Sequence, residues 1–160
     1  MLCEKILGNL NDGKFDGKNV DYVDIEWHEA FKKIHRKTSG NGTDVAVRLD
    51  DGILLKGLRQ GDVLGESDGC VIAVNVPECD VLLIKVDVHH PHMREKVCYE
   101  VGNRHATLFW GEGENEFVTP VNDNAMMAML EGLHGVTVKR DRRKLDFDRG
   151  LSSTVHSHSH

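Results

Sequence analysis

The hydrophobic pattern of this 160-residue chain changes once, near residues 76 to 80. Before this point, short apolar runs are separated by turn signals roughly every ten residues, which indicates strands. After it, apolar residues also recur at a spacing of four, which indicates amphipathic helices between strands. The chain therefore divides into two small units, a β-rich one over residues 1–77 and a mixed one over residues 78–149.

The first unit contains several apolar runs of strand length. Asp50–Gly52 and Ser67–Gly69 are turn signals between them, and Gly61 with Asp62 can form a further turn. This spacing favours a small β-sandwich or barrel-like unit. The strands are expected at Tyr22–Trp27, Val45–Leu49, Ile53–Leu55 and Cys70–Val74, with a further segment at Leu58–Leu64.

The second unit shows the order β-α-β-β-α-β, which is the ferredoxin-like split motif. In its first helix Met93, Val97 and Val101 lie on one face. The predicted fold class is therefore α+β, a β-rich domain followed by a ferredoxin-like domain. The strands are expected at Asp80–Val86, Thr107–Trp110, Glu116–Thr119 and Val136–Val138.

Turn and cap residues set the expected ends of the two helices. Pro91 suits the first turn of the first helix, and Gly102 suits its left-handed exit. Asp123 or Asn124 can cap the second helix, and Gly135 is expected to stop it.

Composition argues against several classes of function. The net charge is −6, and the basic runs at residues 32–37 and 139–144 are short, so we expect no nucleic-acid partner. No apolar run approaches membrane-spanning length, and residues 1–5 do not resemble a signal peptide, so a cytoplasmic protein is expected. Nucleophile-elbow, P-loop and zinc-protease motifs are absent, which argues against the common enzymes.

Histidines are the residues that point to chemistry. His105 follows Gly102 at an expected sharp helix exit, where a rigid junction would fix its side chain. The tail over residues 150–160 is small and polar, is expected to be flexible, and carries His156, His158 and His160. Imidazole suits Ni, Zn and Cu ions, so His105 and the tail form a candidate metal site.

The three tail histidines alternate with serine. In an extended chain alternate side chains point the same way, so they can converge on one ion, or one can reach His105. An expression-tag fragment is the competing interpretation. The interrupted pattern favours a native tail.

The remaining histidines have a simpler interpretation. His89, His90 and His92 surround Pro91 at the start of the first helix, about 15 Å or more from His105 at a rise of ~1.5 Å per residue. They therefore cannot share the His105 ion within one chain. Exposed polar residues are the favoured interpretation and a weak accessory metal site the minority one. A structural role alone is expected for His28, His35 and His134.

Two strings of residues resemble the UreE family of urease accessory proteins. Tyr99 and the Gly-Asn-Arg-His string from Gly102 to His105 match the family signature, although Glu100 stands where histidine is frequent. The segment Leu58–Leu64 is similar to a Leu-Arg-Asp-Gly-Asp-x-Leu hairpin of the family. The resemblance covers essentially the whole chain. Some relatives carry a further His-x-His pair, which the stretch over residues 116–124 lacks.

The resemblance implies a nickel metallochaperone with a peptide-binding-like first domain. It implies a homodimer in which His105 of each chain meets its mate near the two-fold axis and shares one Ni(II) ion. Dimers could pair around the ion, and Zn(II) or Cu(II) could bind in vitro. The implied partners are the urease accessory GTPase and the apo-urease activation complex. Two rival hypotheses stay open: a general Zn/Ni buffer, and a peptide-binding module with incidental histidines.

Overall fold

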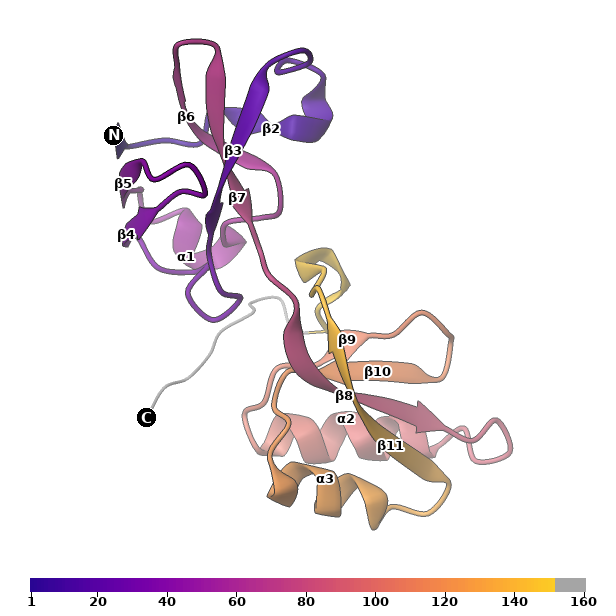
Figure 1. Cartoon of the computed structure of the whole chain (residues 1–160). Helices are drawn as coiled ribbons and strands as arrows, with labels where there is room; N and C mark the ends of the chain where they lie inside the picture. Colours follow the sequence, from indigo (N-terminus) through magenta and orange to yellow (C-terminus); the bar gives the residue numbers. More distant parts are fainter. Residues whose placement is uncertain (152–160) are drawn as a thin grey trace. The chain divides into compact units, whose positions relative to one another are not determined.

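A computed structural model describes residues 1–151, and its contacts divide the chain into two compact units (Figure 1). The first unit is Met1–Pro77 and the second begins at Glu78. The fold is mixed α+β with more strands than helices, which confirms the predicted fold class. Across these 151 residues, no helix is both long and apolar enough to cross a membrane.

The first unit holds two small sheets. A three-stranded sheet has the order β1-β5-β4, and a four-stranded sheet has the order β2-β6-β7-β3. β1 pairs with β5 and β3 pairs with β7 in parallel, and the other pairs are antiparallel. The elements are β1 (Leu2–Cys3), β2 (Gly8–Asn9), η1 (Leu10–Asp12), β3 (Asn19–Asp24), β4 (Ile34–Thr38), β5 (Asp44–Arg48), α1 (Ile53–Lys56), β6 (Asp62–Ser67) and β7 (Cys70–Asn75).

The predicted strand at Ile53–Leu55 is wrong, because these residues form the short helix α1. The Asp50 side chain accepts a hydrogen bond from the Gly52 N–H at 2.8 Å and starts a helical turn. Only Ile53 of the run is buried, whereas Leu54 and Leu55 are exposed. A short apolar run alone does not distinguish a strand from a helical turn.

The segment Leu58–Leu64 does contain the expected turn at Gly61 and Asp62. Gly61 adopts φ +81°, and the Asp62 carboxylate accepts from the Arg59 N–H at 2.8 Å and from Asn9 Nδ2 at 3.0 Å. Asp62 is buried, so these bonds satisfy a charge that would otherwise be costly to bury. The string is therefore a structural turn that leads from α1 into β6 and hydrogen-bonds to Asn9 of β2.

The second unit has the predicted βαββαβ order, with all neighbouring strands antiparallel in the order β11-β8-β10-β9. This is the strand order of the split motif, so the ferredoxin-like prediction is confirmed. The elements are β8 (Cys79–Val86), α2 (Met93–Asn103), β9 (Phe109–Trp110), β10 (Glu116–Thr119), α3 (Asn124–Glu131), β11 (Val136–Arg143) and η2 (Phe147–Arg149).

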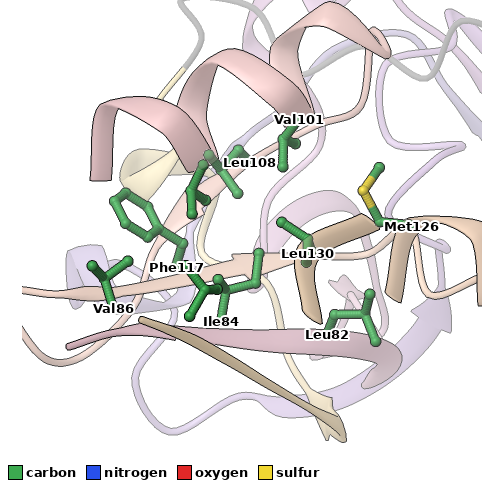
Figure 2. Close-up of a cluster of buried hydrophobic side chains, with 10 residues drawn as sticks. Leu82, Ile84, Val86, Val101, Leu108, Phe117, Met126 and Leu130 are labelled. Atoms are coloured by element: carbon green, nitrogen blue, oxygen red, sulfur yellow. The ribbon is translucent and has the colours of Figure 1, made fainter. Parts of the chain in front are cut away.

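Both helices of this unit pack on one face of its sheet. Figure 2 shows Val101 of α2 and Leu130 of α3 directed toward Phe117 of β10 and Ile84 of β8. Phe117 and Leu130 are fully buried, and truncating such side chains costs about 2 to 5 kcal/mol of unfolding free energy. This core holds both ends of α2 in place.

The helix ends differ in part from the predictions. α3 is capped as expected, because the Asp123 side chain accepts from the Met126 N–H at 2.7 Å. It ends at Glu131, before Gly135, which instead adopts φ +71° in the loop to β11. Pro91 precedes α2 rather than joining its first turn, and its carbonyl accepts from the Arg94 N–H at 3.1 Å.

Candidate metal centre

The corner that follows α2 carries the candidate ligand His105. The Ala106 N–H donates to the Val101 carbonyl at 3.2 Å, and the His105 N–H donates to the Gly102 carbonyl at 2.9 Å. These two bonds form a Schellman motif, whose left-handed position is His105 itself with φ +54°. The expected left-handed exit at Gly102 is therefore wrong, since Gly102 lies within the helix.

A histidine at this position is unusual. The left-handed position of a Schellman motif is usually glycine, because any other side chain there costs about 1 to 2 kcal/mol of backbone strain. Strained backbone is concentrated at functional sites, where the surrounding structure enforces it. Here the chain keeps an imidazole where glycine would give a more stable turn, which indicates that the side chain has a use.

Buried contacts fix the chain on the far side of the corner. Thr119 of β10 is fully buried, and its hydroxyl donates to the Thr107 carbonyl at 2.8 Å. Ala106 packs against the core that Val101 enters. His105 is exposed while the residues on both sides of it are anchored. The corner can therefore present an imidazole to solvent from a rigid base.

The neighbours of His105 on α2 supply no second ligand to this corner. Cys98 is half-buried and packs against the core, and burial raises the pKa of its thiol. A raised pKa disfavours the thiolate that binds metals. Glu100, where the family often has histidine, forms an ion pair with Lys96 at 3.4 Å on the helix surface. Tyr99 is 66% exposed beside the corner.

As the side chains of the described residues are oriented, one chain does not by itself complete a metal site. Within residues 1–151, no group of three or more His, Cys, Asp or Glu side chains is arranged to hold an ion. The predicted tail ligands His156, His158 and His160 lie outside the described residues. His105 can therefore offer one imidazole, and further ligands would come from the tail, solvent or a second chain.

The other histidines fall into two groups. His35 is buried in β4, with its Nε2 atom 2.9 Å from the Lys32 carbonyl, and burial lowers its pKa. His28 is exposed and lies edge-on to Trp27. Both observations agree with the structural roles predicted for these two residues.

The contact between His134 and His90 could not be predicted from the sequence. The His134 ring lies 4.5 Å from that of His90, centroid to centroid. The two residues are far apart in the sequence, and no local pattern joins them. The pairing of β8 with β11 brings their loops together. This contact is at the start of α2, away from the His105 corner.

Comparison with known proteins covers both units. Residues 3–77 match the family model of the UreE urease accessory protein N-terminal domain, and residues 80–160 match that of the C-terminal domain. This chain belongs to the UreE family of urease accessory proteins. The resemblance carried by the Gly-Asn-Arg-His and Leu58–Leu64 strings is thereby confirmed.

UreE relatives match along nearly the whole chain. The urease accessory protein UreE of Helicobacter pylori strain P12 is 42% identical over 155 residues, 97% of this chain and 88% of the relative. The UreE of Helicobacter acinonychis is also 42% identical over 155 residues. The UreE of Acetivibrio thermocellus is 38% identical over 162 residues and covers 100% of both chains. Membership of the UreE family supports a role in urease maturation.

Proposed function

We propose that this UreE chain is a cytoplasmic nickel metallochaperone that collects Ni(II) through His105 and delivers it for urease maturation. The observation that carries the proposal is His105 itself, an exposed imidazole kept at a strained left-handed corner. Imidazole suits Ni(II), and membership of a urease accessory family supplies the biological setting.

The proposed carrier is a homodimer. One imidazole is too few ligands for a nickel ion, and a two-fold axis doubles each residue close to it. A pair of His105 corners would share one ion, with water or tail histidines in the remaining positions. A pair of dimers around one ion is a further form that this ligand count allows. Such an incompletely filled site can exchange its cargo.

Delivery is a ligand exchange, so no covalent bond of a substrate is made or broken. The exposed corner lets an incoming ligand approach the ion while His105 still holds it. The tail histidines His156, His158 and His160 would capture ions and guide them to the corner. The proposed recipients are the urease accessory GTPase and the apo-urease activation complex.

Nickel titration tests the role of His105. We expect the His105→Ala variant to lose the tightest nickel site, observed by calorimetry, while its circular dichroism spectrum stays unchanged. The unaltered chain should bind one nickel ion for every two chains at that site. The matched control is His28→Ala, an exposed histidine in the first unit, which should bind as the unaltered chain does. Unchanged tight binding in His105→Ala would refute the proposal.

A second experiment separates a urease chaperone from a general metal buffer. Urease activation would be measured in cells that carry either the unaltered chain or His105→Ala as their UreE. The proposal predicts low urease activity with His105→Ala and recovery when excess nickel is supplied. Full activity with both His105 and the tail histidines replaced would favour the peptide-binding alternative.

A further inference from the structure

Two loops of the second unit meet at the start of α2. The Asp87 N–H donates to the Gly135 carbonyl at 2.8 Å, beside the strand pair Val86 and Val136. The first loop then turns tightly, since the His90 N–H donates to the Asp87 carbonyl at 2.9 Å. The loop between β8 and α2 is thus joined to the loop between α3 and β11 by a main-chain hydrogen bond.

Three imidazoles gather where these loops meet. The rings of His90 and His134 lie 4.5 Å apart at an interplanar angle of 68°, and the ring of His92 lies 6.4 Å from that of His90. His92 and His134 are exposed, and His90 is partly buried. The His90 ring is therefore held by its surroundings, whereas the rings of His92 and His134 are accessible to solvent.

The His90 side chain packs directly against the backbone of Gly135. A side-chain carbon at Gly135 would come within 2.9 Å of His90 Cδ2, closer than such atoms approach in real proteins. The glycine also adopts φ +71°, which a larger residue would adopt only with strain. The backbone of one loop therefore positions the imidazole of the other.

The spacing of the two closest rings fits a shared metal ion. Two imidazoles bound through nitrogen at ~2.1 Å hold their ring centres about 4.5 to 5.2 Å apart for bond angles of about 90° to 109°. The His90 and His134 rings already lie at 4.5 Å. They contact each other edge to face, so ring rotation is needed to turn a nitrogen of each toward one point. His134 is exposed and can rotate at low cost.

In their present orientation these three rings are not arranged to hold an ion. We propose that, once the rings rotate, His90 and His134, with His92 as a third ligand, form a second and weaker metal site. It takes a divalent transition ion such as Zn(II) or Ni(II), with water in the remaining positions. The eleven-residue helix α2 separates this site from His105 by about 15 Å at ~1.5 Å per residue. The site therefore binds its ion independently of the His105 corner, whether or not that corner carries nickel.

The test uses the full chain with the other candidate ligands removed. His105 is replaced by Ala and the three tail histidines by Ser, and Zn(II) alone is titrated while the imidazole resonances are followed by NMR. The His90, His92 and His134 resonances should move together and saturate near one ion per chain. The proposal is overturned if none of the three moves.

Substitutions of two exposed histidines, His134 and His89, give a matched comparison of Zn(II) binding. In the same background, His134→Gln should weaken Zn(II) binding by tenfold or more, whereas His89→Gln, an exposed position in the first loop, should change it less than twofold. Equal binding by the two variants would also overturn the proposal. Since His105 is absent throughout, failure here leaves the nickel-carrier proposal standing, and failure of that proposal leaves this result standing.

Discussion

The two ends of α2 hold histidines in contrasting ways. At its C-terminal end a single imidazole, His105, is positioned by hydrogen bonds within six consecutive residues, Val101 to Ala106. At its N-terminal end His90 meets His134 only because β8 and β11 pair. One arrangement is encoded in a short string and the other in the tertiary fold. The first can therefore be recognised in a sequence, and the second becomes visible only in the structure.

The largest expected effect is the loss of nickel affinity when the histidine at the C-terminal end of α2 is replaced. His105→Gly should weaken nickel binding by more than about 100-fold, because the fixed imidazole is lost. It should also raise stability by about 1 kcal/mol relative to His105→Ala, because only glycine relieves the left-handed strain. Nickel calorimetry and urea unfolding of both variants measure the two effects. If Gly and Ala variants were equally stable, the strain at this corner would be refuted.

The next effect concerns the anchor behind His105. Thr119→Val keeps the shape of a fully buried side chain but removes two hydrogen bonds, the one that the hydroxyl donates to the Thr107 carbonyl and the one that it accepts from the Val121 N–H at 3.3 Å. Losing these buried hydrogen bonds costs about 1 to 3 kcal/mol of unfolding free energy. Urea unfolding would measure it, with the exposed Thr137→Val as control, for which a change within about 0.5 kcal/mol is expected. Equal costs at the two positions would contradict this role of Thr119.

A comparison of two glycine substitutions tests the packing of His90 at the N-terminal end of α2. Gly69→Ala carries only backbone strain, since φ is +76° and its added carbon meets nothing within 4 Å. Gly135→Ala carries similar strain, at φ +71°, and also collides with His90. We expect Gly135→Ala to cost about 1 kcal/mol more than Gly69→Ala in thermal unfolding, as overpacking does. A smaller cost at Gly135 would show that His90 is not seated there.

The smallest expected effect is on the pH dependence of stability, and it compares buried His35 with exposed His28. Burial lowers the pKa of His35 in the folded chain, so the unfolded chain binds the extra proton more readily. The stability contribution of His35 is therefore complete above the unfolded pKa of about 6.5 and is lost as pH falls below it. The difference between the urea unfolding midpoints at pH 7 and pH 5.5 should become smaller in His35→Gln than in the unaltered chain. In His28→Gln this difference should stay unchanged. An unchanged pH dependence in His35→Gln would contradict this.

Much of the fold could be predicted because its patterns are local. The spacing of Met93, Val97 and Val101 identified α2, and the cap at Asp123 identified the start of α3. The run at Ile53–Leu55 could not be assigned to a strand or a helix, since three residues are too few to show a period. Gly135 was assigned to a helix end, whereas its positive φ serves the loop that receives His90.

The candidate site could be predicted in identity but not in geometry. The Gly-Asn-Arg-His string identified His105 and the family, yet glycine preference placed the left-handed turn at Gly102 instead of His105. Propensity favours glycine there, and the hydrogen bonds from His105 and Ala106 move the turn three residues onward. The contact between His90 and His134 needed strand pairing across the sheet, which no short string contains.

The most direct test of nickel carriage by His105 is diffraction at the nickel absorption edge, from crystals of the unaltered chain grown with Ni(II). The account predicts an anomalous peak between two chains, bound by the His105 imidazole of each. Corner imidazoles directed apart, with no nickel peak between any pair of chains, would contradict it.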